Sequence, residues 1–453
     1  MNALALPPRA RAAVLVTRGV NALSRHLGMG SGTVAGGHAG LAVDPELLAH
    51  LAAGRRVALV TGTNGKTTTT RLLAVAVEGA LGPAATNATG SNMPQGHVTA
   101  LATSPPGAAA VLEVDEGYVP GLVASLTPDV VVLLNLSRDQ LDRTNEVRMV
   151  ASRWRRALAD APRTVAVANA DDPLVAWAAQ VAARPVWVAA GLSWRADAVG
   201  CPACEGRIAF AEPPAAGWSC TCGFSRPAPD VWIEGEDLVT AGGRRTRLRL
   251  QLPGRFNRLN AAMAAAAAGA LGVPADEAVA RMGTVGEVAG RFALVTVGGS
   301  RARLMLAKNP AGWVELLDLV CPGHDPVVVG INARAADGRD PSWLWDVPFE
   351  RLAGRFVVAT GERCRDLAVR LRYAEVDHRA VPDPVAAVRL AAMRLGAGRR
   401  GAGTAGAPVD VMAVDGAPVD GAPVDGAPVD GAPVDVIGNY TAFHDLLSRA
   451  AGR

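Results

Sequence analysis

Residues 57–70 read V-A-L-V-T-G-T-N-G-K-T-T-T-T. The first four residues form an apolar run typical of a buried strand, and the Gly-containing turn that follows leads into a predicted helix that includes Arg71. A strand, a turn and a helix in this order make a phosphate cradle, because the backbone N–H groups of the turn and the positive end of the helix attract a polyphosphate. The stretch therefore predicts an α/β fold that binds a nucleotide.

Two side chains of this cradle have specific predicted roles. Lys66 would reach the terminal phosphates, and the Thr67 hydroxyl would bind a nucleotide-bound Mg²⁺. The general pattern for such loops has Gly where this chain has Val60, so the stretch matches the T-G-T-N-G-K-T variant. A chance Gly-Lys-Thr in an ordinary strand-turn-helix is the alternative. The residues expected to contact the nucleotide here are Thr63, Asn64, Gly65, Lys66, Thr67 and Thr68.

The composition argues against a membrane-spanning or nucleic-acid-binding protein. Half of the 453 residues are hydrophobic, but no apolar run approaches the roughly 20 residues of a membrane span. With 45 basic and 42 acidic side chains the net charge is +3, and no basic block carries interleaved aromatics. The apolar patch at 12–16, flanked by arginines, is too short for a signal peptide and predicts an amphipathic helix. We therefore expect a cytoplasmic protein with no transmembrane segment and no nucleic-acid partner.

Three further predicted strands each end in polar residues. They span 108–112, 129–134 and 164–168. Because the carboxyl ends of parallel strands meet at one edge of a sheet, Glu113 after the first strand and the Asn169–Asp172 segment after the third are expected to line one cleft. Strands that alternate with helices predict a parallel, doubly wound sheet. Glu113 is a candidate Mg²⁺ ligand, with a solvated loop carboxylate as the alternative.

Residues 195–230 interrupt this pattern with an insert that contains two close cysteine pairs. The pairs are Cys201 with Cys204 and Cys220 with Cys222, the second being C-x-C rather than the usual C-x-x-C. Four thiolates at this spacing suit a tetrahedral Zn²⁺ that folds a small ribbon with little core of its own. Because disulfides are disfavoured in the cytosol and four cysteines leave no open coordination position, we predict a structural zinc.

The segment L-P-G-R-F-N-R-L-N at 252–260 leads into an Ala-rich run of strong helix formers. Asn257 and Asn260 share one face at the helix start, where they would either read a nucleotide base or cap the helix. Strand-like alternation restarts after residue 290, which places a domain boundary near 288. The predicted parts are an N-terminal helix with a Gly-rich loop (1–45), a central nucleotide-binding domain (46–288) and a C-terminal domain (289–453).

The C-terminal domain alternates strands with helices and predicts a smaller Rossmann-like unit. Its apolar strand at 326–331 precedes the loop A-D-G-R-D-P-S-W-L-W-D at 336–346. An acidic, Gly-containing loop at the carboxyl end of a strand is typical of a functional loop, and a turn packed by two tryptophans is the alternative. The pentapeptide G-A-P-V-D recurs near the end of the chain. We interpret 406–435 as a low-complexity linker, because such short Gly- and Pro-containing units cannot build a core.

Several of these motifs, in this order, resemble the Mur ligase superfamily of ATP-dependent ligases, which join amino acids or amines to carboxylates. The resemblance rests on T-G-T-N-G-K-T at 61–67, E-V-D-E at 113–116, N-L-S-R-D-Q-L-D-R at 135–143, N-A-D-D at 169–172 and F-N-R-L-N-A-A at 256–262. The four-Cys insert and the 336–346 loop resemble the MurT type of ligase subunit. The resemblance implies a central P-loop ATPase domain with a parallel sheet and a zinc-ribbon insert, followed by a smaller Rossmann-like domain.

The resemblance also implies a reaction. The α-carboxylate of D-glutamate in the lipid II stem peptide would take the γ-phosphoryl group of ATP, and ammonia would convert the resulting acyl phosphate to D-isoglutamine. Lys66 and Mg²⁺, held by Thr67 and Glu113, would neutralise charge on the phosphoryl group. Arg291, at the junction with the C-terminal domain, would swing onto the γ-phosphate.

The remaining site residues follow from the same resemblance. Asn257, with Asn260 beside it, and the loop that contains Asn169 and Asp172 would hold the adenine and the ribose. An acid of the 336–346 loop would orient or deprotonate the ammonia. The candidates are Asp337 and Asp340, with Asp346 as a weaker third.

An amidating ligase needs a source of ammonia. Neither Cys321 nor Cys364 has the surroundings of a nucleophile, so the sequence contains no glutaminase signature. The resemblance implies that a glutaminase subunit, GatD, supplies the ammonia within a heterodimer, and that lipid II is reached at the inner face of the membrane. Two alternatives stay open: a single-chain Mur-like amino-acid ligase of the folylpolyglutamate or cyanophycin type, and a non-catalytic nucleotide-binding module.

Overall fold

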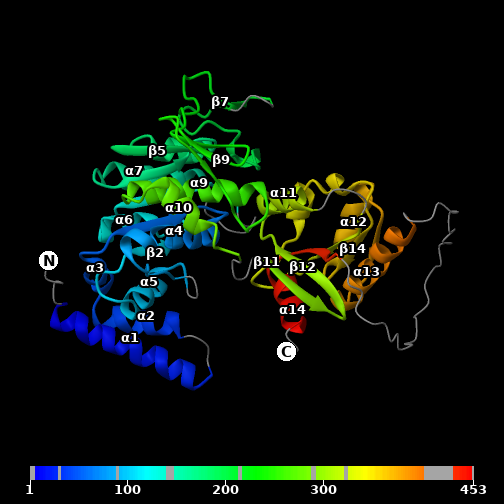
Figure 1. The fold of residues 1–453 in the computed structure, drawn as a ribbon, viewed down its shortest axis with the longest axis horizontal. Coiled ribbons are helices and arrows are strands. Elements are labelled where there is room, and N and C mark those ends of the chain that lie inside the picture. The colour runs from blue at the N-terminus through cyan, green and yellow to red at the C-terminus, as the bar shows by residue number, and fades with distance from the viewer. Residues whose placement is uncertain are drawn as a thin grey trace. The chain divides into compact units, whose positions relative to one another are not determined.

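The computed structural model forms two compact units, the first ending before residue 287 and the second beginning after residue 291 (Figure 1). Each unit is built around one main sheet. The residues that the structure describes are 6–28, 32–87, 91–138, 147–212, 217–286, 292–320, 325–401 and 432–450.

The first unit contains an eight-stranded sheet in the order β10-β9-β8-β5-β4-β3-β1-β2. The six strands from β8 to β2 are parallel, and β9 and β10 extend the sheet as an antiparallel edge. Every residue of β1, β3 and β4 is buried, as expected for parallel strands covered on both faces. The strands are β1 (Val57–Thr61), β2 (Ala110–Glu113), β3 (Val130–Leu133), β4 (Val165–Asn169), β5 (Arg184–Ala189), β8 (Val231–Glu234), β9 (Asp237–Thr240) and β10 (Arg245–Arg247).

Helices cover both faces of this sheet (Figure 1). Leu59 of β1 enters a core shared with α5 to α8, whereas its neighbour Val60 enters a second core shared with α4, α9 and α10. The two-residue period of a strand thus feeds two hydrophobic layers, which confirms the predicted doubly wound α/β architecture. The helices are α1 (Pro8–His26), α2 (Thr33–Val43), α3 (Leu47–Ala52), α4 (Lys66–Leu81), α5 (Pro94–Thr103), α6 (Val119–Leu126), α7 (Val147–Ala159), α8 (Pro173–Ala179), α9 (Arg255–Ala270) and α10 (Ala275–Met282).

The four-Cys insert lies between β5 and β8. It contains only the two-stranded ribbon of β6 (Ala209–Phe210) and β7 (Trp218–Ser219) and a single 3₁₀ turn, Ala196–Ala198, among its described residues. Its small hydrophobic core includes Ile208 and Trp218 and extends to Ala176 of α8. An insert with so few apolar residues needs another source of stability, which is consistent with a metal site.

The second unit has a six-stranded sheet in the order β11-β12-β16-β13-β14-β15, parallel except for β11. Residues of α13 and α14 share a hydrophobic core with the strands. No helix in the described parts of the chain is both long and apolar enough to cross a bilayer. The strands are β11 (Phe292–Val297), β12 (Ser300–Leu306), β13 (Val327–Gly330), β14 (Val357–Thr360), β15 (His378–Ala380) and β16 (Val434–Gly438), and the helices are α11 (Pro310–Leu319), α12 (Cys364–Tyr373), α13 (Pro384–Gly401) and α14 (Tyr440–Ala450), with 3₁₀ turns at Ser342–Asp346 and Phe349–Leu352.

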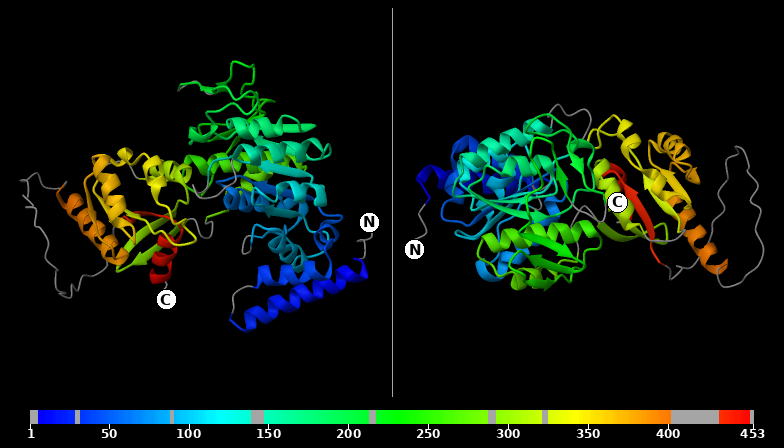
Figure 2. Two further views of the ribbon diagram at one scale, coloured as in Figure 1. Left: turned by 180° about the vertical axis from the view of Figure 1, so that it is seen from behind. Right: turned by 90° about the horizontal axis from the view of Figure 1, so that it is seen from above.

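The C-terminal strand β16 corrects one boundary of the sequence analysis. Most of the expected linker, 406–435, falls outside the described residues, but its last two residues, Val434 and Asp435, belong to β16. This strand pairs with β12 on one side and β13 on the other, as the red arrow in Figure 2 shows. Asp435 accepts two hydrogen bonds from the Arg303 guanidinium, at 2.6 and 2.9 Å. The last pentapeptide copy therefore contributes to a buried strand, because its Val and Asp have partners in the sheet.

Candidate functional site

The turn between β1 and α4 has the backbone shape of a phosphate cradle. Gly62 and Gly65 have φ values of 137° and 85°, a conformation that favours glycine. A Cβ at Gly65 would lie 2.6 Å from Oδ1 of Asn260, and a Cβ at Gly62 would lie 2.9 Å from the backbone nitrogen of Asn135. Gly65 directly precedes the 16-residue helix α4, whose N-terminus thus opens onto the turn.

The segment after β3 holds the cradle in this shape. The Thr63 and Asn64 N–H groups donate to the backbone and side-chain oxygens of Asn135, at 3.0 and 2.9 Å. The Thr63 hydroxyl donates to the Ser137 carbonyl and accepts from the Ser137 N–H, both at 3.0 Å. These bonds show that Thr63 and Asn64 shape the turn through neighbouring loops, so that its remaining N–H groups are preorganised for a ligand.

Lys66 is buried at the start of α4, with Thr67 half-buried and Thr68 buried beside it. The Lys66 ammonium donates to the Gly62 carbonyl at 2.6 Å and to Oε1 of Glu116 at 3.0 Å. Burial raises the pKa of the Glu116 carboxyl, and the charge of Lys66 opposes that rise. A phosphate entering the cradle would compete with Glu116 for the same ammonium group.

Glu113 lies at the same edge of the sheet as the cradle. It is the last residue of β2, and its Cα pairs with that of Val60 in β1. The Asn87 amide fixes its backbone by accepting from the Glu113 N–H and donating to the Glu113 carbonyl, both at 2.8 Å. No side chain in the described part of the chain pairs with the Glu113 carboxylate. A carboxylate in this position, with the Thr67 hydroxyl in the first turn of α4, fits the oxygen-rich coordination of Mg²⁺.

The structure gives the two asparagines of α9 different surroundings. Asn260 lies against Gly65 of the cradle. Asn257 donates through its side-chain nitrogen to the Pro253 carbonyl at 2.6 Å. The N-cap residue is Gly254, and no side chain caps the helix. Asn257 therefore binds the chain before the helix, and Asn260 is the one that contacts the phosphate loop.

A pocket of about 670 Å³ lies beside the start of α9. The residues that line it include Asp171, Gly191, Arg226, Trp232 and Arg258. The Arg258 Nε is buried and has no hydrogen-bond partner among the described residues. Because buried donors are normally paired, a ligand with an acceptor in this pocket would satisfy it. The volume lies within the usual range for small-molecule sites, about 300–1,000 Å³.

The predicted residues Asn169 and Asp172 bind backbone groups around this pocket. Asn169 donates to the Gly191 carbonyl at 2.9 Å and accepts from the Asp171 N–H at 3.0 Å. Asp172 is the N-cap of α8 and also accepts from the Leu136 N–H at 2.8 Å. Burial raises the pKa of Asp172 to about 6, against the effect of these hydrogen bonds. The acid that lines the pocket is therefore Asp171, which lies between Asn169 and Asp172 in the sequence.

The four-Cys insert brings its sulfur atoms together. All four Sγ atoms lie within 4.8 Å of one another, with Cys201 and Cys222 3.8 Å apart and Cys204 and Cys220 3.5 Å apart. Zn–S bonds of about 2.3 Å in a tetrahedron place sulfurs about 3.8 Å apart, so the cluster fits such an ion. The backbone N–H of Cys222 lowers the pKa of the Cys220 thiol to about 7, whereas burial raises the pKa of Cys201, so Cys220 is the thiol that is deprotonated first. The C-x-C pair thus does not prevent a four-sulfur site.

Two contacts connect the insert to the pocket. The Trp218 indole N–H donates to the Ala170 carbonyl at 3.0 Å. The Arg226 guanidinium donates to Oδ1 of Asp171 at 2.6 Å, and Oδ2 of Asp171 accepts from the Gly191 N–H at 2.7 Å. The folded insert therefore positions an arginine and an aspartate that both line the pocket.

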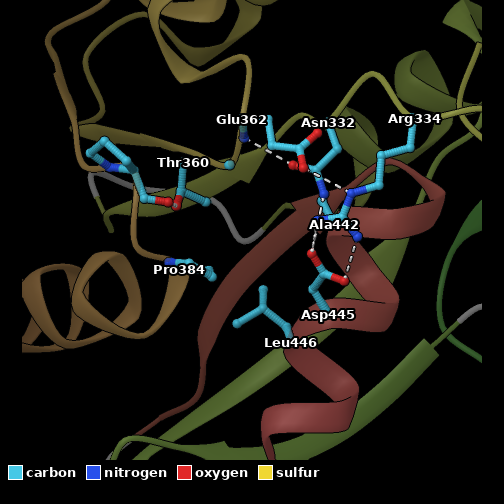
Figure 3. Close-up of a pocket in the computed structure, with 10 residues that line it drawn as sticks. Asn332, Arg334, Thr360, Glu362, Pro384, Ala442, Asp445 and Leu446 are labelled. Atoms are coloured by element: carbon cyan, nitrogen blue, oxygen red, sulfur yellow. Dashed lines mark hydrogen bonds and ion pairs between the residues drawn. The ribbon is translucent and has the colours of Figure 1, made fainter. Parts of the chain in front are cut away.

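The second unit has a smaller pocket, of about 220 Å³, where β13 and β14 end (Figure 3). Arg334 donates to Glu362 at 2.9 Å and to Asp445 at 2.8 Å, and Asn332 donates to Asp445 at 3.3 Å. The bonds to Asp445 and Glu362 raise the pKa of Arg334. The two carboxylates outnumber the single guanidinium, which makes the lining net acidic.

The candidate acids of the 336–346 loop also have different surroundings. Asp337 is buried and accepts from the N–H and the hydroxyl of Thr441, at 2.8 and 2.5 Å. Asp340 is exposed and accepts from the N–H and the hydroxyl of Ser342, both at 2.9 Å. Asp337 therefore holds the start of α14, and Asp340 is open to solvent. Arg291 lies outside the described residues.

Four residues of the site were not selected in the sequence analysis: Glu116, Asp171, Arg226 and Arg258. Glu116, Asp171 and Arg258 each lie inside a quoted motif, as Glu116 does in E-V-D-E, and Arg226 lies in the four-Cys insert, four positions after Cys222. The motifs in the sequence identified the loops that form the site. Which polar residue of each loop points into the site depends on the direction of its side chain, which the sequence does not give.

Two family models match the chain. The Mur ligase middle domain matches residues 60–200, and the MurT ligase C-terminal domain matches residues 306–391. The first range contains the phosphate cradle, Glu113 and the Asn169–Asp172 loop, and the second contains the pocket residues Arg334 and Glu362.

Curated relatives match most of the chain. The lipid II isoglutaminyl synthase (glutamine-hydrolyzing) subunit MurT of Streptococcus pneumoniae is 29% identical over 76% of this chain and 83% of its own length. The MurT subunit of Staphylococcus aureus strain COL is also 29% identical, over 74% of this chain and 81% of its own length.

Solved structures agree on the fold. A pseudomurein peptide ligase type C from Methanothermus fervidus superposes with a TM-score of 0.59 at 18% identity, covering 87% of this chain and 79% of that one. MurF from Acinetobacter baumannii gives a TM-score of 0.60 at 16% identity over 91% of this chain and 80% of its own. Domains, relatives and fold agree, and the chain is a ligase that belongs to the Mur ligase family.

Proposed function

We propose that this chain is the ligase subunit of a lipid II isoglutaminyl synthase, which amidates the α-carboxylate of D-glutamate in the stem peptide to D-isoglutamine. The observation that carries the proposal is the phosphate cradle, in which Gly65 directly precedes the N-terminus of α4 and the Lys66 ammonium is buried against Glu116. The similarity to MurT subunits of lipid II isoglutaminyl synthases supports the choice of substrate.

ATP would lie across one edge of the first unit. Its phosphates would occupy the turn before α4, where Asn260 reaches Gly65, and its nucleoside would occupy the pocket at the start of α9. The unpartnered Arg258 Nε and the Asp171 carboxylate would then bind polar groups of the base and ribose. Mg²⁺, held by Thr67 and Glu113, would neutralise phosphate charge.

The carboxylate needs activation because oxide is a poor leaving group. A carboxylate oxygen of D-glutamate would attack the γ-phosphorus, with ADP as the leaving group, to form an acyl phosphate. Ammonia would then attack the carbonyl carbon, and phosphate would leave as the amide forms. Lys66 would exchange Glu116 for a γ-phosphate oxygen, so that its charge stabilises the transferring group.

The second unit would supply the acid that accepts a proton from ammonia. Asp340 suits this role better than Asp337, because Asp337 is committed to Thr441 and Asp340 is exposed. The ammonia would come from a partner glutaminase, GatD, in a heterodimer that reaches lipid II at the inner face of the membrane. The word subunit in the names of the relatives supports a partner chain.

The metal of the insert would be Zn²⁺ in a structural role, since four sulfur ligands leave no position for substrate. Its effect on the site would be indirect, through Arg226 and Asp171.

Mass spectrometry of lipid II tests the reaction. The chain is incubated with ATP, Mg²⁺ and lipid II, together with ammonia, glutamine, or glutamine plus the glutaminase subunit. We expect a loss of about 1 Da per stem peptide, because amidation exchanges hydroxyl for amine. Lys66→Met should abolish the change, and Asp340→Asn should abolish it while leaving ATP binding intact. An unchanged lipid II mass in every mixture, with ATP consumed only when an amino acid is added, would establish a single-chain amino-acid ligase instead.

A further inference from the structure

Helix α1 exposes most of its large apolar residues and buries polar ones, which is the reverse of an ordinary surface helix. Apart from Val14, the residues it buries against the protein are small or polar: Ala10, Ala13, Thr17, Asn21 and Ser24. Its leucines point outward: Leu15 is 70% exposed and Leu23 is 57% exposed, and the C-cap residue Leu27 is also 57% exposed. A helix that packs on a protein core normally buries its apolar stripe and exposes its polar one. The outward face of α1 therefore needs a different explanation.

The inner face is committed to helix α2. A Cβ at Gly36 would lie 2.0 Å from Oδ1 of Asn21, and a Cβ at Gly40 would lie 2.2 Å from Oγ1 of Thr17. Helices that approach through glycines leave no room for leucine between them. Within the first unit α1 forms an outer edge, drawn in dark blue in Figures 1 and 2. The leucine face cannot turn inward without breaking this contact.

Arginines border the leucine face. Arg11, Arg18 and Arg25 are spaced by seven residues and form one row along the helix, since seven residues complete nearly two turns. All three are exposed, although Arg11 and Arg18 each use their Nε–H to donate to a carbonyl of the protein, those of Leu6 and Ala102, both at 2.8 Å. The first 43 residues contain four arginines and no aspartate or glutamate. An exposed apolar stripe beside a basic row, with no acidic residue, is the pattern of a helix that lies in a membrane interface.

We propose that α1 docks this protein on an anionic phospholipid surface. Leu15, Leu23 and Leu27 enter the boundary of the acyl chains, and the arginine row binds the lipid phosphates. Charge complementarity selects this occupant, because a face with only positive charges matches an anionic bilayer and repels a second copy of itself. The inference goes beyond the proposed reaction and does not depend on it.

Vesicle flotation with the full chain tests the proposal. Vesicles contain either phosphatidylcholine alone or phosphatidylcholine with phosphatidylglycerol, and neither contains lipid II. We expect binding only to the anionic vesicles. Salt at about 0.5 M should weaken this binding, because it screens the surface charge. Leu15→Gln with Leu23→Gln should reduce partitioning about tenfold or more, because less apolar surface enters the bilayer. Arg11, Arg18 and Arg25 replaced together by Gln should reduce it about tenfold or more as well.

Leu294→Gln provides the matched control. Leu294 is 55% exposed in β11 of the second unit, so its substitution makes the same chemical change at similar exposure away from α1. Binding that is absent, or equal for the α1 and control variants, would overturn the proposal. A second outcome would also overturn the proposal. In it, no variant binds vesicles, and the α1 double variant loses a dimer or a complex with the glutaminase subunit that the unchanged chain forms. Equal melting temperatures establish that the variants fold.

Discussion

Arg226 and Asp171 form the ion pair that connects the four-Cys insert to the pocket proposed for the nucleoside. The bond is 2.6 Å long, and the two side chains are 17% and 15% exposed. Asp171 also accepts from the Gly191 N–H at 2.7 Å, so it stays in place when its partner is removed. The substitution Arg226→Met keeps an unbranched apolar stem, removes the guanidinium and leaves Asp171 as a largely buried charge without a cationic partner.

The expected cost follows from this burial. Breaking a fully buried pair costs about 3–5 kcal/mol, and the residual solvent contact of both groups reduces this to about 2–3 kcal/mol. Arg247 provides the comparison, because it is 58% exposed and paired with Glu236. Arg247→Met should cost only about 0.5 kcal/mol, as exposed pairs typically do.

Urea unfolding followed by tryptophan fluorescence measures both variants, since Trp218 belongs to the core of the insert. The difference in midpoint multiplied by the slope gives the change in the free energy of unfolding of the first unit. Calorimetric titration with ATP should show weaker binding for Arg226→Met than for Arg247→Met, because only Arg226 lines the pocket.

A second substitution separates the buried charge from lost packing. The double variant Arg226→Met, Asp171→Asn should recover part of the stability, because it removes the uncompensated carboxylate. Equal costs for Arg226→Met and Arg247→Met, or no recovery in the double variant, would refute the view that a desolvated ion pair holds the insert to the pocket.

Three further predictions concern other parts of the first unit. Gly65→Ala should cost about 2 kcal/mol and abolish ATP binding, whereas Gly82→Ala, also at positive φ but in open space, should cost about 1 kcal/mol by urea unfolding. The raised pKa of Asp172, about 6 when folded, means that the folded state holds this proton more tightly. Stability should therefore fall by up to about 3 kcal/mol as pH rises from about 4 to 6, and Asp172→Asn should remove that slope in unfolding midpoints. Elemental analysis should find about one zinc per chain, lost in Cys201→Ser or on chelation and retained in Cys364→Ser, which lies outside the cluster.

Local chemistry made several features predictable. The strand, turn and helix of the phosphate cradle lie within 57–81, where the apolar run, the glycines and the helix formers are consecutive in the chain. The cysteine cluster could also be predicted from the sequence. Two closely spaced cysteine pairs are typical of a metal site and are rarely required by other kinds of structure. The buried strands before Glu113 and Asn169 follow from short apolar runs that end in polar residues.

Side-chain direction was not predictable in the same way. Glu116 rather than Glu113 contacts Lys66, and Asp171 rather than Asp172 lines the pocket, although each pair shares one motif. Asp337 looked equivalent to Asp340 in the sequence, but it is buried against Thr441, which lies 104 residues further along the chain.

The sequence of this protein alone determined its fold class, the strand-turn-helix at 57–81 and the four-Cys cluster, because each depends on residues close together in the chain. Only the tertiary structure decided which acid pairs with Lys66, how Arg226 connects the insert to the pocket, and that the leucines of α1 face outward. Those features depend on packing between distant segments, where burial and a partner across space, rather than neighbours in sequence, select the orientation of each side chain.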